Sequence, residues 1–250
     1  MLLDKLKMEF LGTFLFIYLT GMAYIQLQTK VVNLTAAASA CLVAYALLLW
    51  CGKAISGAHY NPIISIFLIV SKHMKLTNGL LYVFFQLIAT IFATALLKIS
   101  TPTSILQEMK EDSILGFPKL TINPFKAIIL EMIGSFLIVF GYYMLVLERS
   151  APKYVYGAGL GTILFADMVF LYNKTGCSLN PLRSLAYSMI NHNYSQLYVF
   201  LIGPMLGGIL GSLLGNLLLS EKAESSRQRK KEAKKKKRQT MINKMVSETE

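Results

Sequence analysis

The fold of this chain is decided by the stretch Ser56-Gly57-Ala58-His59-Tyr60-Asn61-Pro62-Ile63, whose pattern returns as Gly176-Cys177-Ser178-Leu179-Asn180-Pro181-Leu182. In both stretches an Asn-Pro pair precedes about ten mostly apolar residues, after which polar residues resume. Asn is a preferred helix N-cap and Pro suits the first helical position, so each pair predicts a helix start. A helix of that length is too short to cross a bilayer, which takes about 20 residues. We therefore predict two half-helices that enter a membrane without crossing it.

The rest of the sequence is apolar enough for a membrane protein. Of the 250 residues, 54% are hydrophobic, and the mean hydropathy is +0.52. Both values are high for a soluble domain. Six apolar stretches have the length of a membrane span: residues 8–27, 34–52, 79–97, 127–147, 155–172 and 196–219. We therefore predict an all-α membrane protein with six transmembrane helices.

The two halves of the chain are copies of one pattern. The segment from Glu9 to Leu15 (EFLGTFL) returns from Glu131 to Leu137 (EMIGSFL), and each half holds three spans and one Asn-Pro segment. Because three is an odd number, the second copy enters the membrane from the opposite side. This predicts an inverted repeat with copies at about residues 8–99 and 125–219. The two half-helices then meet N-terminus to N-terminus near the middle of the membrane.

The formal net charge of +12 is concentrated near the C-terminus. We expect a membrane domain, residues 1–220, followed by a basic, disordered tail, residues 221–250. The linkers 71–78 and 148–154 are also basic, so the positive-inside rule places both termini in the cytoplasm. An alternative role for the tail is binding to anionic lipid headgroups. Nucleic-acid binding is disfavoured, because no aromatic residue is interleaved with the charges.

A few polar residues within the apolar segments are candidates for function. Arg183 lies in the first turn of the second half-helix, where an arginine is costly unless it faces water or a partner. Either it lines a pore, or it pairs with a buried carboxylate such as Asp167. His59 has two interpretations, a place at a pore mouth and plain packing. Glu9 and Glu131 are expected to accept hydrogen bonds from the re-entrant loops.

Other kinds of chemistry find no support in the sequence. No nucleophile, base and orienting group come together, and the three His and three Cys form no metal-ligand pattern. We therefore expect no enzyme activity, no cofactor and no metal site. Cys41, Cys51 and Cys177 all lie in or beside apolar stretches, so each is expected to be a small core residue.

The motifs resemble those of the aquaporin family, also called major intrinsic proteins, over residues 8–219. The resemblance is carried by Glu9-Phe-Leu-Gly-Thr-Phe, Ser56-Gly-Ala-His-Tyr-Asn-Pro, Gln86, Glu131-Met-Ile-Gly-Ser-Phe, Gly176-Cys-Ser-Leu-Asn-Pro-Leu-Arg183-Ser and Gly203-Pro-Met-Leu-Gly-Gly208. It implies six tilted helices plus two half-helices, assembled as a homotetramer with one pore per subunit. The Asn-Pro pairs of the family are kept, but the alanine that follows them is here Ile63 or Leu182. Because both are larger than alanine, the spacing or tilt of the half-helices is expected to differ.

The resemblance also implies a second constriction around Arg183. Its other members fall on Cys177, on Met168, and on either Ala40 or Cys41. The last choice stays open, because the segment 52–56 has one residue more than the usual pattern. Water-selective relatives usually have an aromatic and a His at these places and glycerol-type relatives have aromatics, but neither is present. Ser184 follows the arginine as in water-type members, so the indications for selectivity are mixed.

The function that the resemblance implies is a passive channel for water that excludes ions and protons. Small uncharged solutes such as glycerol or urea are further expected passengers, and the lipid bilayer is the surrounding partner. The amides of Asn61 and Asn180 would donate hydrogen bonds to a passing oxygen. The alternative is a non-conducting, aquaporin-like structural or assembly protein, which Ile63 and Leu182 weakly favour. Cys177 is the expected site of block by a mercurial, with Cys41 as the second choice.

Overall fold

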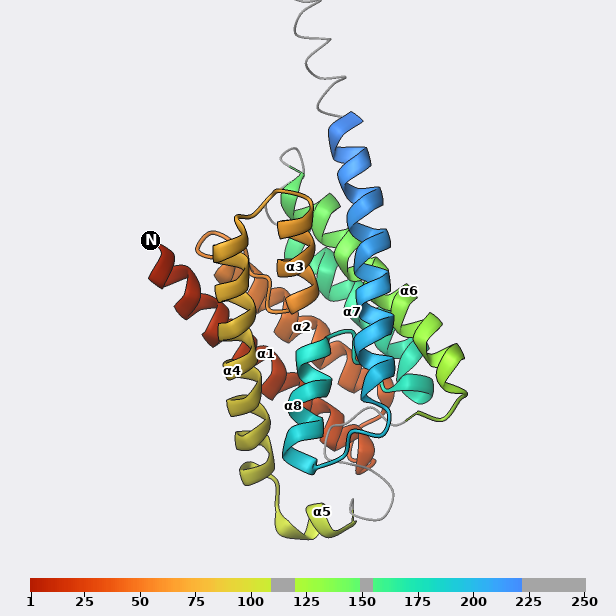
Figure 1. Ribbon diagram of the computed structural model, residues 1–250. Helices are drawn as coiled ribbons and strands as arrows, with labels where there is room; N and C mark the ends of the chain where they lie inside the picture. The colour runs from red at the N-terminus through yellow and green to blue at the C-terminus, as the bar shows by residue number, and fades with distance from the viewer. Residues whose placement is uncertain (109–119, 149–154, 222–250) are drawn as a thin grey trace, which may run out of the picture.

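The computed structural model describes residues 1–108, 120–148 and 155–221, and helices are the only regular structure in these ranges (Figure 1). In chain order the helices are α1 (Leu2–Gln28), α2 (Leu34–Gly52), α3 (Pro62–Val70), α4 (Leu76–Ser100), α5 (Thr103–Glu108), α6 (Pro124–Tyr142), a π-helical turn (Tyr143–Leu147), α7 (Val155–Thr175), α8 (Pro181–Asn191) and a C-terminal helix (Leu197–Glu221). Six of them are long and apolar enough to cross a membrane, namely α1, α2, α4, α6 with its π-helical end, α7 and the C-terminal helix. The predicted all-α membrane fold is confirmed.

Some spans are longer than their apolar stretches. α1 begins at Leu2 rather than at residue 8, and Asp4, Lys5 and Lys7 extend it with exposed side chains. Long charged side chains at the end of a span can reach the membrane surface while their stems lie along apolar groups. The polar residues that ended the predicted stretch therefore do not end the helix.

The half-helices α3 and α8 have 9 and 11 residues. Asn61 and Asn180 are their N-caps, and a proline follows each. The Asn61 side-chain oxygen accepts a hydrogen bond from the amide of Ile63 at 3.2 Å, and that of Asn180 from the amide of Leu182 at 3.0 Å. Figure 1 shows α3 above α8 at the centre of the molecule, so the two short helices together occupy the depth of one span.

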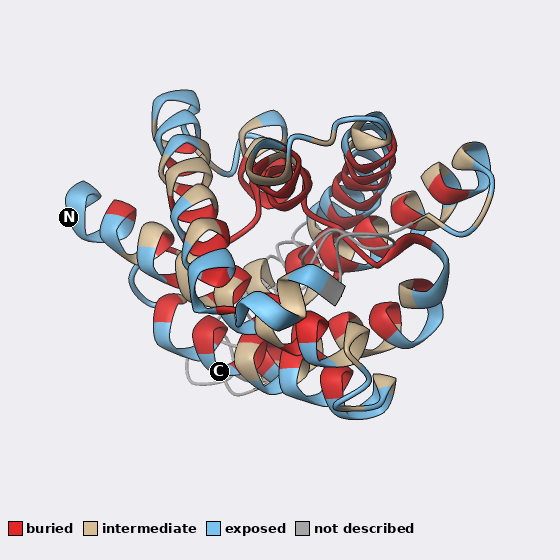
Figure 2. Cartoon of the chain, turned by 90° about the horizontal axis from the view of Figure 1, so that it is seen from below, coloured by how far each residue is buried: buried red, intermediate tan, exposed pale blue. Residues whose placement is uncertain are grey.

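The long helices enclose the half-helices. Figure 2 shows the buried faces of the helices turned inward and the exposed faces turned outward. The outward faces carry large apolar side chains, among them Phe92, Phe170 and Leu213. In a chain that spans a membrane, such faces lie against lipid, because lipid tails are as apolar as these side chains.

The C-terminal helix lies directly against the backbone of α6. Gly203, Gly207 and Gly211 recur every four residues, so they line one side of the helix. A Cβ atom at Gly207 would come within 3.0 Å of the Met132 carbonyl oxygen and the Phe136 amide nitrogen. Small residues allow this close approach, which provides much of the contact between helices in a membrane.

Two sequence predictions concern residues outside the described ranges. They are the basic tail beyond Glu221 and residues 149–154 of the second basic linker. The division of the chain into residues 1–220 and 221–250 therefore stays a prediction.

Candidate functional site

The loop that leads into α3 has left-handed backbone at two non-glycine residues. Ala58 and Tyr60 have φ values of +56° and +49°, which cost of order 1–3 kcal/mol each. Glu9 of α1 holds this loop, because its carboxylate accepts hydrogen bonds from the amides of His59 and Tyr60, both at 3.0 Å. Gln86 of α4 donates to the same carboxylate at 2.8 Å.

The loop that leads into α8 is built in the same way around Glu131 of α6. Cys177 and Leu179 have φ values of +55° and +52°. The Glu131 carboxylate accepts hydrogen bonds from the Thr175 hydroxyl at 2.6 Å, the Ser178 amide at 3.1 Å and the Leu179 amide at 2.8 Å. Glu9 and Glu131 thus occupy equivalent places in the two halves, and each fixes the backbone of one re-entrant loop.

The two loops meet at the N-termini of the half-helices. Asn61 Nδ2 donates to the Leu179 carbonyl at 2.8 Å, and Asn180 Nδ2 donates to the Tyr60 carbonyl at 3.4 Å. Each asparagine therefore caps its own half-helix through oxygen and reaches the opposite loop through nitrogen. An amide nitrogen carries two hydrogens, so each asparagine keeps a second donor for another acceptor.

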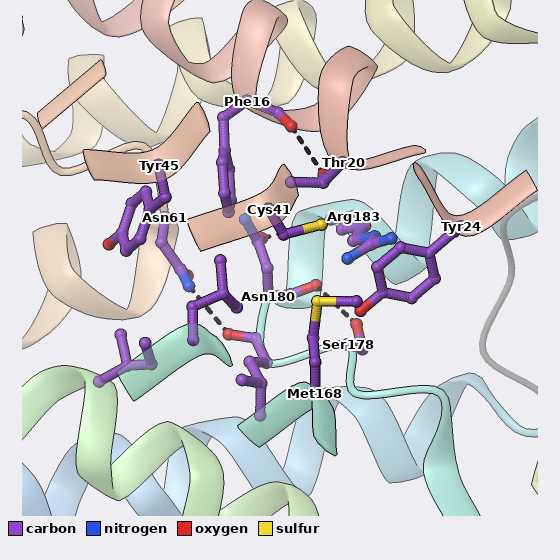
Figure 3. Close-up of a pocket in the computed structure, with 13 residues that line it drawn as sticks. Phe16, Thr20, Tyr24, Cys41, Tyr45, Asn61, Met168, Ser178, Asn180 and Arg183 are labelled. Carbon is purple, nitrogen blue, oxygen red and sulfur yellow. Dashed lines mark hydrogen bonds between the residues drawn. The ribbon is translucent and has the colours of Figure 1, made fainter. Parts of the chain in front are cut away.

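A narrow cavity lies beside this junction (Figure 3). Its volume is about 20 Å³, counted as positions open to the centre of a water molecule. One water needs roughly 10–15 Å³ in that measure, so the cavity holds one or two waters. The lining is mostly apolar with a few polar groups, and consists of Phe16, Thr20, Tyr24, Cys41, Tyr45, Asn61, Ile138, Leu164, Met168, Ser178, Leu179, Asn180 and Arg183.

Arg183 is buried at this cavity, and its partners are aromatic. Its guanidinium carbon lies 4.0 Å from the centroid of the Tyr24 ring and 5.7 Å from that of Tyr187. The Nε and Nη2 atoms have no hydrogen-bond partner among the described residues. Within those residues no ion pair joins Arg183 to Asp167, so the ion-pair interpretation of Arg183 is wrong. The guanidinium therefore keeps donors that no described residue uses.

The structure brings together most of the residues that were predicted to form the constriction. Arg183, Met168 and Cys41 line the cavity, as do both asparagines. Of the two candidates in the second span, Cys41 lines the cavity. Ala40 is exposed, so its candidate role in the constriction is wrong. Successive residues of an α-helix point about 100° apart, so only one of these two neighbours can face inward.

His59, Ile63 and Leu182 are buried, but they do not line the cavity. The His59 Nδ1 atom lies 2.9 Å from the Ser65 hydroxyl, and its ring packs against Tyr82 and Tyr142. His59 therefore packs within the core, and its place at a pore mouth stays a prediction. The large side chains after the two Asn-Pro pairs fill the core around the half-helices instead of narrowing the cavity.

The three cysteines have three different environments. Cys41 lines the cavity. Cys177 is buried and is not among the residues that line the cavity, and its backbone carbonyl accepts a hydrogen bond from the Tyr24 hydroxyl at 3.0 Å. Cys51 is exposed near the end of α2, so the prediction that it is a core residue is wrong.

We expect a mercurial to inhibit flux through this cavity by reacting with Cys41. A bulky group on that sulfur would fill a space that holds one or two waters. Cys41→Ser should therefore abolish the inhibition, whereas Cys177→Ser, the choice that the sequence favoured, should leave it unchanged. The check is the rate of osmotic shrinkage of proteoliposomes with and without the reagent. The opposite pattern, with protection by Cys177→Ser alone, would contradict the assignment.

Sequence reasoning missed the contribution of α1 to the site. Phe16, Thr20 and Tyr24 all line the cavity. Their spacing of four residues places them on one face of the helix, and a threonine between two aromatics on that face was the available signal. Tyr45 of α2 also lines the cavity and was missed.

Six spans and two half-helices that meet at a narrow cavity define a membrane channel built from an inverted repeat. The chain belongs to the family of major intrinsic proteins, whose sequence model matches residues 2–214. That family consists of channels and not of enzymes, so the chain is a multi-pass transmembrane channel of the aquaporin family.

Several relatives of this chain are aquaporins. Aquaporin C of Dictyostelium discoideum is 27% identical over 87% of this chain and 81% of its own length. Aquaporin TIP4-2 of Zea mays is 30% identical over 70% of this chain and 65% of its own length. Aquaporin-1 of Bos taurus is 31% identical over 61% of this chain and 55% of its own length. Among solved structures, the aquaglyceroporin from Plasmodium falciparum matches with a TM-score of 0.78 over 88% of this chain and 99% of its own. Its identity of 18% supports the fold alone.

Proposed function

We propose that the chain is a passive channel for water, with small uncharged solutes such as glycerol or urea as further passengers, and that it excludes ions and protons. The observation that carries the proposal is the cavity in which Asn61, Asn180 and Arg183 meet. All three carry hydrogen-bond donors, and much of the remaining lining is apolar. A water or a solute hydroxyl can therefore exchange its bonds with bulk water for bonds to these donors.

The half-helices supply the barrier to cations. Each N-terminus carries roughly +0.5 of an elementary charge, and the N-termini of α3 and α8 both face the junction. Arg183 adds a full positive charge at the same cavity. A cation or a proton would meet this field without a compensating carboxylate, because none of the described residues that line the cavity is an Asp or a Glu.

Two further proposals concern assembly and orientation. Aquaporin-type channels usually form homotetramers with one pore per subunit, and we propose the same for this chain. The basic linker at 71–78 and the basic tail support a cytoplasmic position for both termini.

The experiment that tests the proposal compares proteoliposomes that contain the purified chain with empty liposomes in an osmotic shrinkage assay. A channel accelerates shrinkage in proportion to the protein incorporated. Folded protein that leaves the shrinkage rate at the level of empty liposomes would favour the non-conducting alternative. That alternative lacks support from the cavity, whose donors are all in place.

The range of solutes should depend on Met168. Methionine is flexible and apolar, so it can yield to a passenger larger than water. Met168→His adds a stiff, polar ring. We expect this variant to lower glycerol flux about tenfold and water flux by less. A tenfold effect is the discrimination that a change of one small group gives in an apolar pocket. Parallel water and glycerol assays on one preparation measure the ratio. Because Ile63 and Leu182 do not line the cavity, the double variant Ile63→Ala/Leu182→Ala should leave the glycerol-to-water ratio unchanged. A changed ratio in this double variant, with none in Met168→His, would assign selectivity to the midplane.

A further inference from the structure

Tyr24 of α1 lies where the predicted constriction lacks an aromatic side chain. The constriction residues that the sequence indicated, namely Arg183, Met168, Cys177 and Cys41, include no aromatic or His side chain. The Tyr24 ring lines the same cavity as Met168 and Arg183 and is 1% exposed (Figure 3). A different helix therefore supplies an aromatic wall at this level of the cavity.

The orientation of the Tyr24 ring is fixed by three contacts. Its face lies on the Arg183 guanidinium, with 4.0 Å between the ring centroid and the guanidinium carbon. Its hydroxyl donates to the Cys177 carbonyl at 3.0 Å. Its edge meets the ring of Tyr172 of α7 in a T-shaped contact with the centroids 5.2 Å apart. These contacts come from the loop, α8 and α7, so the ring cannot turn aside for a passenger without losing several of them at once.

The contact with Arg183 also explains how a buried guanidinium is kept without a carboxylate. A cation over an aromatic face is stabilised by the electron-rich ring, and the gain is larger where water is excluded. The guanidinium carbon lies over the face of the ring. Two of the guanidinium nitrogens have no partner among the described residues.

We infer that Tyr24 is a specificity-determining residue of this channel, and that its ring sets the ratio of glycerol to water flux. The inference rests on the proposed function. Water is small, and its oxygen can accept hydrogen bonds from the Arg183 guanidinium and from the asparagine amides. Glycerol must pass its carbon backbone beside a fixed ring in a cavity of about 20 Å³. The ring therefore acts as a steric barrier whose removal benefits the larger passenger far more than water.

The test measures water and glycerol permeability on the same proteoliposomes for native protein, Tyr24→Leu and Tyr24→Phe. Tyr24→Leu removes the ring, and we expect it to raise the glycerol-to-water ratio about tenfold. Tyr24→Phe keeps the ring and loses only the bond to the Cys177 carbonyl, so its ratio should stay near the native value. The matched control is Tyr18→Leu, the same substitution on the same helix. The Tyr18 hydroxyl donates to Ser100 of α4, and Tyr18 does not line the cavity. Tyr18→Leu should leave the ratio unchanged.

A native glycerol-to-water ratio in Tyr24→Leu, with water flux retained, would overturn the inference. An equal rise in Tyr24→Phe and Tyr24→Leu would also overturn it, because the loop contact and not the ring would then set the ratio. If Tyr24→Leu does not fold, Tyr24→Met replaces the rigid ring by a flexible side chain and carries the same expectation. Failure of the proposed function looks different, since native protein itself would then show no water flux above empty liposomes.

Discussion

Glu131→Leu is expected to prevent the chain from reaching a stable folded state. The leucine removes the acceptor of the Ser178 and Leu179 amides and of the Thr175 hydroxyl, which keeps only a long contact of 3.5 Å to the Leu171 carbonyl. Each unsatisfied buried donor costs about 1–3 kcal/mol, so the total is comparable to the whole stability of an ordinary domain. The loop also loses the contacts that hold Cys177 and Leu179 in left-handed backbone.

The measurement is thermal unfolding of the detergent-purified protein, together with its elution profile. Glu131→Gln should lower the melting temperature less than Glu131→Leu does. The glutamine amide keeps one acceptor oxygen, and only its NH2 group faces donors that it cannot satisfy. The matched control is Asp167→Asn. Asp167 is a buried carboxylate of α7 whose Oδ2 has no hydrogen-bond partner among the described residues, so the change should cost little. A native melting temperature for Glu131→Leu would contradict the role given to this residue.

Gly207→Leu should separate the C-terminal helix from α6. A Cβ atom at this position already conflicts with backbone atoms of Met132 and Phe136. Backbone cannot turn aside as a side chain can, so the helices must move apart. We expect a loss of more than about 3 kcal/mol, beyond the usual range for overpacked cores.

A second glycine provides the control for this effect. At Gly159 of α7, an added Cβ would meet only the side chain of Leu145. That side chain can change its rotamer, so Gly159→Ala should be tolerated, whereas even Gly207→Ala should lower the melting temperature. Equal melting temperatures for Gly207→Ala and native protein would show that the helices are not in backbone contact.

The sequence was sufficient to predict the framework of the fold. Span length and the two Asn-Pro pairs predicted the six membrane helices and the half-helices, because both depend on local composition and capping. The ends of α1 and α4 were less predictable, because charged residues at a membrane surface can continue a helix. The choice between Ala40 and Cys41 depends on the rotation of α2, which the ambiguous loop alignment left open.

The composition of the site was predicted only in part. Arg183 and Met168 were placed at the cavity by motif and spacing. Tyr24 was missed because a tyrosine in an apolar helix is usually an ordinary core residue, and its contact with Arg183 joins two distant segments. Cys177 is not among the residues that line the cavity, although its carbonyl accepts a hydrogen bond from Tyr24, which does line it.

The central claim is that water passes the junction of the half-helices while charge does not. The most direct test follows water permeability and the decay of potassium and proton gradients in the same preparation of native proteoliposomes. The account predicts osmotic shrinkage well above that of empty liposomes, with both gradients decaying as slowly as they do in empty liposomes. Shrinkage no faster than in empty liposomes, or gradients that collapse in proportion to the protein incorporated, would contradict it.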